Sequence, residues 1–302
     1  MHALIILGLV GFGAQLINGS LGMGYGVTST SALLLAGTTP ALASATVNFS
    51  QVGSQLVSGY AHWRFGNLDW RVVRLIALPG ALGAFVGATF LSWLAVEIAR
   101  PLMALILLAL GSYILVRFTV WGTARASVSG HVPTGVLTPV GLVGGFLNST
   151  AGGGWGPVGT STLLATGRLE PRTVIGSVSA AEFAVVVAGS AGFVAGLGIG
   201  GINFHWVVVM LAGGVVAAPI AAWLARHIPG RMLGSLVGGL IVITNLHNLL
   251  GSGWISVPPA AQPAVYGAIG LVWAGSVAWS ARAHRIATRP SPAAAQRVSR
   301  AS

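Results

Sequence analysis

Long apolar runs alternate with short polar or glycine-rich segments along the whole chain of 302 residues. A membrane-crossing helix needs about 20 predominantly apolar residues. Seven runs have this length or come close to it, and they cover residues 40–62, 71–95, 101–118, 172–197, 204–225, 231–250 and 259–282. The pattern therefore predicts an all-α integral membrane protein.

Shorter apolar runs come in two pairs, 3–17 with 27–36 and 134–147 with 157–167. A helix of ten or eleven residues rises about 15 Å, which is half of the bilayer core. We therefore expect two helical hairpins, at 1–36 and 134–167, each with a glycine-rich turn at membrane depth. Irregular backbone is tolerated there only where it is buried in protein or lines a wet cavity. Half-deep re-entry and two full, tilted crossings both fit this pattern.

The two turns are copies of one sequence element. Residues 18–34 align without gaps with residues 148–164. The identical pairs are Asn18 with Asn148, Gly22 with Gly152, Gly24 with Gly154, Gly26 with Gly156, Thr30 with Thr160, Ser31 with Ser161, Leu33 with Leu163 and Leu34 with Leu164. After one inserted residue, Pro40 aligns with Pro171, Asn48 with Ser179 and Gln51 with Glu182. A repeat of this length indicates a duplicated fold.

Each copy consists of a hairpin and three crossing helices. Repeat 1 covers 1–120 and repeat 2 covers 134–250; a cytoplasmic linker at 121–133 joins them, and an extra span at 259–282 and a disordered basic tail at 283–302 follow. Because three is an odd number, we expect the two copies to insert with opposite orientation. Inverted-topology repeats with broken helices that meet near the midplane are characteristic of secondary transporters.

Charge placement sets the expected orientation. Only 6% of the residues are charged, and all fifteen basic residues are arginine. With both hairpins entering and leaving on one side, fourteen arginines fall on one face, and Arg100 is the exception. The positive-inside rule then places the N-terminus outside and the C-terminus in the cytoplasm. Arginine between apolar runs does not make the basic surface that binds nucleic acid, so the expected surroundings are the lipid bilayer.

Glycine-rich turns at membrane depth are candidate anion sites. Without Cβ atoms their backbone N–H groups can approach a ligand, and the helix that follows adds the positive end of its dipole. Amide and hydroxyl side chains complete a neutral, donor-rich cup. The predicted substrate-binding residues are Asn18, Ser20, Gly22, Gly24, Tyr25, Gly26, Asn48, Gln51, Asn148, Thr150, Gly152, Gly153, Gly154, Trp155 and Ser179. The alternative is that glycine and serine only permit tight helix crossing.

One polar helical face and its copy carry the remaining candidates. In span 40–62 the spacings of three and four place on one face Ser44, Asn48, Gln51 and Gln55. In the copy, Glu182 lies ten residues beyond Arg172 and so about 15 Å into the membrane. A carboxylate at this depth is costly and faces a partner or a cavity. Glu182 is thus a proton-coupling candidate, and a buried structural hydrogen-bonding role is the alternative.

Other side chains leave few further sites. Tyr25 aligns with Trp155 inside the turns, where an aromatic gate and simple packing are both open interpretations. The chain has no cysteine and its histidines include no pair at i and i+4, so we expect neither a metal site nor a disulfide. His247 belongs to a polar cluster that is either a packed helix end or a ligand site. No cofactor is expected, because the chain contains no P-loop.

The duplicated turns give the chain a family resemblance. The chain resembles the sulfite exporter TauE/SafE family, also called the 4-toluene sulfonate uptake permeases. The resemblance covers nearly the whole chain and rests on the turns Gly22–Gly26 and Gly152–Gly156, on the helices that begin at Pro40 and Pro171 with the polar residues Asn48 and Ser179, and on third helices rich in small residues. It implies a bacterial inner-membrane carrier of sulfite, sulfonates or related sulfur oxyanions, with both turns near the substrate. The resemblance does not imply proton coupling, because the internal symmetry of the repeat is broken where Gln51 aligns with Glu182.

Pattern and resemblance together predict a secondary transporter that exports sulfite or a small organosulfonate by alternating access, driven by membrane potential or protons. An uptake permease for the same anions is the first alternative, since gradients and coupling set the direction. A passive channel, whose flux would not saturate, is the second. A membrane-embedded enzyme is disfavoured, because Glu182 and His247 are the only deep ionisable candidates for catalysis. The sequence leaves the oligomeric state open.

Overall fold

The computed structural model describes the whole chain except residues 1, 22, 122–129, 228–229 and 288–302. The described residues form helices and connecting turns, and no strand occurs among them. The α-helices are α1 (His2–Leu21), α2 (Tyr25–Leu35), α3 (Pro40–Arg64), α4 (Trp70–Trp93), α5 (Val96–Val116), α6 (Thr134–Ala151), α7 (Ser161–Ala165), α8 (Pro171–Leu197), α9 (Phe204–His227), α10 (Gly230–Leu250) and α11 (Gln262–Ala287). Two π-helical turns, η1 (Arg117–Trp121) and η2 (Gly156–Thr160), and a 3₁₀ turn, η3 (Ile199–Gly201), complete the order.

Within the described part of the chain, five helices are long and apolar enough to cross a membrane. They occupy Trp70–Trp93, Val96–Val120, Pro171–Leu197, Gly230–Leu250 and Gln262–Ala283. In α1 and α9 the apolar stretches are shorter, Leu4–Asn18 and Phe204–Ala218. Helix α3 has 25 residues but is too polar to meet this criterion, because the face from Ser44 to Gln55 is built of amides and hydroxyls. The described residues are therefore all-helical and multi-pass, as the hydropathy pattern predicts, and the polar face of α3 is buried.

Local sequence explains where several helices begin. Pro40 and Pro171 stand at the first position of α3 and α8, where a missing N–H leaves no hydrogen bond unmade. Asp69 caps α4, and its Oδ1 accepts hydrogen bonds from the backbone N–H groups of Arg71 (2.9 Å) and Val72 (3.2 Å). The backbone N–H of Asp69 donates to Ser177 Oγ at 2.8 Å. This bond ties the start of α4 to α8.

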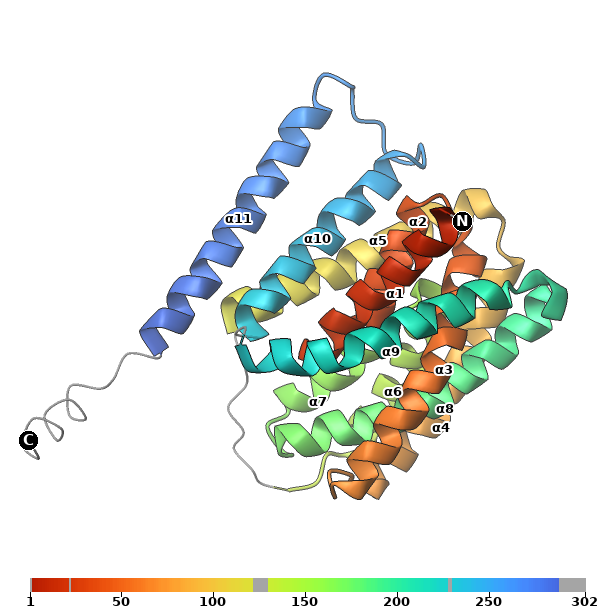
Figure 1. The fold of residues 1–302 in the computed structure, drawn as a ribbon, viewed down its shortest axis with the longest axis vertical. Helices are drawn as coiled ribbons and strands as arrows, with labels where there is room; N and C mark the ends of the chain where they lie inside the picture. The colour runs from red at the N-terminus through yellow and green to blue at the C-terminus, as the bar shows by residue number, and fades with distance from the viewer. Residues whose placement is uncertain (1, 22, 122–129, 228–229, 288–302) are drawn as a thin grey trace, which may run out of the picture.

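Helices from the two halves of the chain pack against each other. Helix α1 lies along α9, α6 lies along α4, and α8 packs against both α3 and α4 (Figure 1). Helix α5 pairs with α10. Glycines allow the α4–α6 backbones to meet, since a Cβ on Gly83 would overlap the carbonyl of Leu142. Helix α11 stands at the outside of the bundle, where it packs against α10 and η1 (Figure 1).

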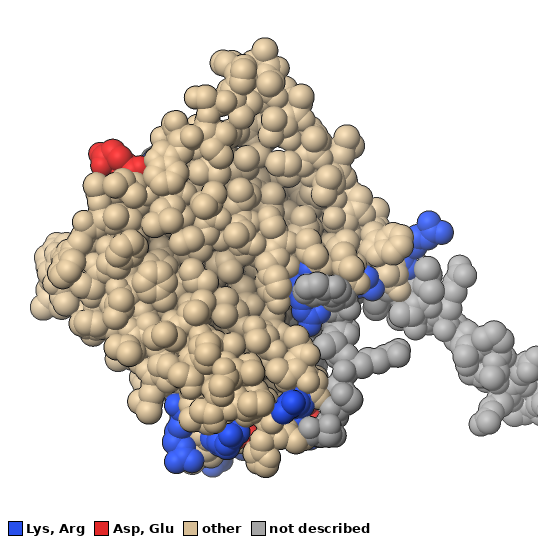
Figure 2. All heavy atoms as spheres, turned by 180° about the vertical axis from the view of Figure 1, so that it is seen from behind, with Lys and Arg blue, Asp and Glu red and all other residues tan. Residues whose placement is uncertain are grey.

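Arginine side chains gather toward one end of the body. Figure 2 shows them along the lower and right-hand edge of the face in view, while the rest of that face is nearly free of charge. Two of them hold the end of the linker. Arg71 Nη1 donates to the carbonyl of Val132 at 2.9 Å, and Arg168 Nη1 donates to the carbonyl of His131 at 3.0 Å. These contacts place the start of α6 at the same end as the α3–α4 and α7–α8 connections.

Candidate functional site

Two glycine turns form the centre of the candidate site. After α1 the chain reverses through Gly24, whose φ is 104°, and α2 begins at Tyr25. After α6 it reverses through Gly152, whose φ is 71°. Residues that carry a side chain rarely adopt such φ values, so glycine is required at both reversals. In each copy, the glycine-rich turn therefore ends one helix, and the next helix begins within a few residues.

The two turns touch through their backbones. A Cβ added to Gly26 would overlap the carbonyl oxygen of Gly152 and lie 2.6 Å from the Cα of Gly153. A Cβ added to Gly153 would overlap the backbone of Gly26 and Val27. Segments that are separated by more than 120 residues in sequence thus meet with no side chain between them. The first turn of α2 forms one side of this contact, and η2 begins three residues after Gly153.

A small polar cavity of about 10 Å³ lies where the turns meet. Its described lining residues include no Lys or Arg and are Asn18, Met23, Gly24, Tyr25, Gly26, Gln51, Asn148, Gly153, Gly156, Pro157 and Glu182. The first backbone hydrogen bond of α2 runs from the N–H of Thr28 to the carbonyl of Gly24 at 3.0 Å. The N–H groups of Tyr25, Gly26 and Val27 therefore precede the helical hydrogen-bond pattern, which is the arrangement that favours an anion at a helix start.

Asn148 fastens the second turn to α3. Its Oδ1 accepts a hydrogen bond from the backbone N–H of Trp155 at 3.4 Å, across the turn. Its Nδ2 lies 3.5 Å from Asn48 Oδ1, and Asn48 Nδ2 in turn donates to the carbonyl of Ser44 at 2.9 Å. Ser44 Oγ donates to the carbonyl of Ser149. The polar face of α3 thus holds the turn in place by a chain of hydrogen bonds.

Glu182 is held by two amides from α3. Gln51 Nε2 donates to Glu182 Oε1 at 3.3 Å, and Gln55 Nε2 donates to Oε2 at 2.7 Å. Each carboxylate oxygen therefore accepts one hydrogen bond from the same helix. A carboxylate inside a membrane protein requires such partners.

A second, larger cavity of about 420 Å³ lies next to the turn cavity. It is enclosed by α1, α3 and α8, and most of its lining is polar. The lining residues are Gln15, Asn18, Leu21, Ser54, Gln55, Ser58, His62, Ile175, Ser179 and Glu182. We call this space the vestibule.

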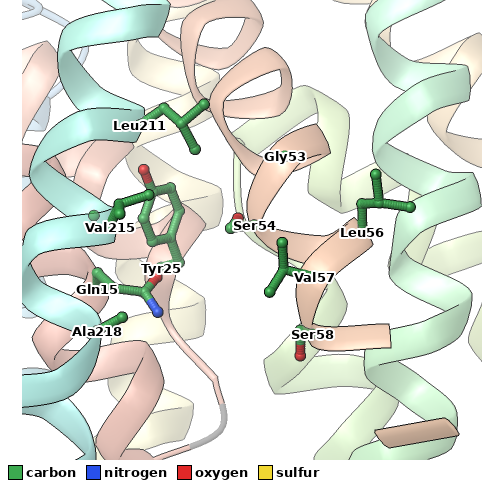
Figure 3. A pocket seen from close by; sticks show the side chains of 11 residues that line it. Gln15, Tyr25, Gly53, Ser54, Leu56, Val57, Ser58, Leu211, Val215 and Ala218 are labelled. Carbon is green, nitrogen blue, oxygen red and sulfur yellow. The ribbon is translucent and has the colours of Figure 1, made fainter. Parts of the chain in front are cut away.

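A third cavity, of about 620 Å³, is mainly apolar and lies between α1, α3 and α9. Figure 3 shows Tyr25 and Gln15 on one side of this space and Ser54 and Val57 on the other, with Leu211 and Val215 above and beside them. Gln15, Ser54 and Ser58 line both this cavity and the vestibule. The ring of Tyr25 reaches from the turn toward the apolar space.

Comparisons with known proteins agree with this architecture. Residues 7–247 match the family described as "Sulfite exporter TauE/SafE". The chain belongs to the TauE/SafE family. It is also 45% identical over 279 residues to the "Probable membrane transporter protein YtnM" of Bacillus subtilis (strain 168), and the match covers 92% of each chain. The comparison with solved structures gives no match. The protein is thus a TauE/SafE membrane transporter and not an enzyme, as the duplicated turns predict.

The TauE/SafE fold brings about half of the predicted binding residues to the turn cavity. Those that line it are Asn18, Gly24, Tyr25, Gly26, Gln51, Asn148 and Gly153, together with Glu182. Ser179 lines the vestibule. Gly22 and the side chain of Ser20 lie outside the described residues.

Five predicted residues lie in the turns or pack against them and do not line the cavity. Asn48 bonds to Asn148, and Thr150 Oγ1 donates to the carbonyl of Phe146 at 2.8 Å, within its own helix. Gly152 lies against Thr30 and Gly154 against Leu147. Trp155 is fully buried in a hydrophobic cluster, and its Nε1 donates to the carbonyl of Val178 at 3.0 Å. Its contacts favour the packing interpretation for Trp155, whereas Tyr25 lines two cavities.

Several lining residues were not predicted from the sequence. Ser58 and His62 continue the helical face of Gln51 and Gln55 at spacings of three and four residues. Extending the same periodicity toward the end of the span would therefore have predicted them. Gln15 precedes Asn18 by three residues on α1 and could have been found in the same way.

The polar cluster near the end of α10 belongs to helix packing. His247 Nδ1 lies 3.1 Å from the hydroxyl of Tyr266 on α11. Asn245 Nδ2 donates to Ser31 Oγ at 2.7 Å and so ties α10 to α2. Among the described residues, no group of three or more His, Cys, Asp or Glu side chains could hold a metal ion.

Proposed function

We propose that this transporter exports sulfite or a small organosulfonate, or a related sulfur oxyanion, across the bacterial inner membrane by alternating access. The observation that carries the proposal is the backbone contact between the two glycine turns beside a polar cavity. Consecutive backbone N–H groups and the start of a helix bind an anion without a fixed positive charge.

The donors around the turn cavity suit a small oxyanion. Asn18, Gln51 and Asn148 each bring an amide to the cavity, which at about 10 Å³ has room for about one water in the state described, so the turns must open to admit an anion. Neutral donors can bind a singly or doubly charged oxyanion and still release it, as transport requires. The turns are the proposed substrate site, and the buried residues that pack against the turns, such as Asn48 and Trp155, maintain its shape.

Helix packing supports the proposed inverted repeats. The first hairpin helix of repeat 1, α1, lies along α9 of repeat 2, and the first hairpin helix of repeat 2, α6, lies along α4 of repeat 1. The two contacts are equivalent under exchange of the repeats. Helices α3 and α8 are also equivalent, and they pack against each other. In our proposal the repeats rock against one another around the turns, as in other transporters built from inverted repeats.

The proposed orientation follows the arginine-bearing end of the body. By the positive-inside rule that end is cytoplasmic, with the N-terminus outside and the C-terminus inside. Glu182 is the proposed proton-coupling group. It borders the turn cavity, and its copy in the other repeat is the uncharged Gln51, so only one proton site would serve the two turns.

Sulfite flux in proteoliposomes tests the proposal. Purified protein should move sulfite down an imposed gradient with saturable kinetics, and taurine, sulfoacetate or thiosulfate should compete when they share the site. Sulfate serves as the comparison anion. Flux that rises linearly with concentration would indicate a channel, and undetectable movement of every sulfur oxyanion would contradict the proposal.

A further inference from the structure

The vestibule has the composition of a water-accessible path. Eight of its ten lining residues are polar or ionisable: Gln15, Asn18, Ser54, Gln55, Ser58, His62, Ser179 and Glu182. Polar side chains at membrane depth face the bundle interior or a wet cavity, because contact with lipid is costly. A volume of about 420 Å³ is enough for a hydrated small anion and several waters.

The vestibule runs toward the arginine-bearing end. On α3 its lining extends from Ser54 to His62, two residues before Arg64, and on α8 it extends from Glu182 back to Ile175, three residues after Arg172. Seven or eight residues of helix span about 10–12 Å, so both walls cover a similar depth. The wide space therefore lies on the side that our orientation assigns to the cytoplasm.

Two residues stand at the inner limit of the vestibule. Asn18 on α1 and Glu182 on α8 are the residues that line both the vestibule and the turn cavity. The turn cavity beyond them is about 10 Å³, so the path narrows sharply at this pair. Gln51 and Gln55 hold the Glu182 carboxylate against α3.

We propose that the vestibule is the cytoplasmic access route to the anion site and that Asn18 and Glu182 form its inner gate. The structure is then an inward-facing state with the gate closed. The proposal rests on the proposed function, since it names the path by which cargo reaches the turns. Opening requires Glu182 to leave at least one of its two amide partners, because those bonds fix the carboxylate at the narrow point.

The natural absence of cysteine makes the route directly testable. Single variants Ser58→Cys and Ser179→Cys place thiols in the vestibule. Ser276→Cys on α11 is a matched control outside it. Ser252→Cys lies just after α10, whose second residue is Arg231, and so marks the end of the body opposite the arginines. Each would be treated with a negatively charged, membrane-impermeant methanethiosulfonate, in right-side-out and in inside-out membrane vesicles.

Both vestibule thiols should react at least about tenfold faster from the cytoplasmic side, because reaction requires a thiolate that the reagent can reach. Ser276→Cys should react slowly from both sides, and Ser252→Cys should react from outside. Faster labelling of Ser58→Cys and Ser179→Cys from outside, or none from either side, would overturn the route. Labelling is measured without cargo, so the route can be supported even if the protein moves no sulfite. If the protein moves sulfite but the two thiols react from the outside, the proposed route is rejected and the proposed function is not.

The gate has its own test. Met23→Cys places a thiol in the turn cavity but not in the vestibule. Combined with Glu182→Ala, it should react from the cytoplasmic side about tenfold faster than alone, because the narrowing side chain is removed. Asn18→Ala in the same background is the second variant and should act in the same direction. Unchanged rates in both combinations would show that this pair is not the gate.

Discussion

Gln51 donates a hydrogen bond to Glu182 at 3.3 Å, although the two residues occupy the same position in the two copies of the repeat. Helices α3 and α8 therefore face each other through equivalent positions, and the contact joins an amide to a carboxylic acid. A chemically symmetric pair would offer either two amides or two acids. The difference between Gln51 and Glu182 gives one ionisable group to the cavity where the two turns meet.

Glu182→Gln tests whether this group carries the coupled proton. The variant keeps the side-chain length; its amide oxygen can accept from one of Gln51 and Gln55, and its NH2 group can donate to the carbonyl oxygen of the other when that amide turns over, so the fold should remain intact. We expect transport to lose its dependence on pH between the two sides of the membrane. Glu97→Gln, which changes an exposed acid in the first turn of α5, is the matched control. A pH profile of Glu182→Gln that follows the parent would refute proton coupling at this residue.

Gly26→Ala should drive the two turns apart. The added methyl group would overlap the backbone of Gly152 and Gly153, and backbone cannot move aside as a flexible side chain can. Overpacking typically costs about 1–3 kcal/mol, so thermal stability should fall along with sulfite flux. Gly13→Ala on α1 meets nothing within 4 Å and should leave both unchanged. Normal flux and stability in Gly26→Ala would mean that the turns do not touch.

Trp155→Phe separates packing from gating. The change removes the hydrogen bond from Trp155 Nε1 to the carbonyl of Val178 and reduces contact in a buried cluster. The Val178 carbonyl keeps its helical partner within α8, so the lost hydrogen bond costs about 0.5–1.5 kcal/mol; the smaller ring also leaves space in the cluster, and the melting temperature should fall. Sulfite affinity should stay near that of the parent, since the ring does not line the turn cavity. An affinity change with unchanged stability would return Trp155 to the binding site.

The sequence predicted the structure best at positions where the backbone geometry admits only one or two residue types. Proline at the first position of α3 and α8, and glycine at the reversals at Gly24 and Gly152, follow from backbone geometry alone. The polar spacing on α3 likewise predicted a face that lines the site. The apolar run at 40–62 predicted a crossing helix, and α3 (Pro40–Arg64) covers it, although its polar residues keep it below the hydropathy that the five most apolar long helices reach.

Contacts between distant segments could not be predicted in this way. Sequence could not show that Asn148 reaches Asn48, because this depends on how α6 packs against α3. Nor could it show that Trp155 points into a core beside Val178, because this depends on how the turn after α6 packs against α8. The π-helical turn η2 is a further departure from the symmetry of the repeat, since the equivalent first turn continues directly as α2. Equivalent residues, such as Tyr25 and Trp155, consequently have different surroundings.

Equilibrium binding of radiolabelled sulfite to the purified transporter tests most directly whether the two turns form one anion site. Asn18→Ala and Asn148→Ala should each weaken binding about 10- to 150-fold, which corresponds to roughly 1.5–3 kcal/mol for a lost hydrogen bond to a charged group. Asn203→Ala, at the start of α9 and outside the cavity, is the matched control and should bind as the parent does. Unchanged affinity in both Asn18→Ala and Asn148→Ala, in protein that remains folded, would contradict the account.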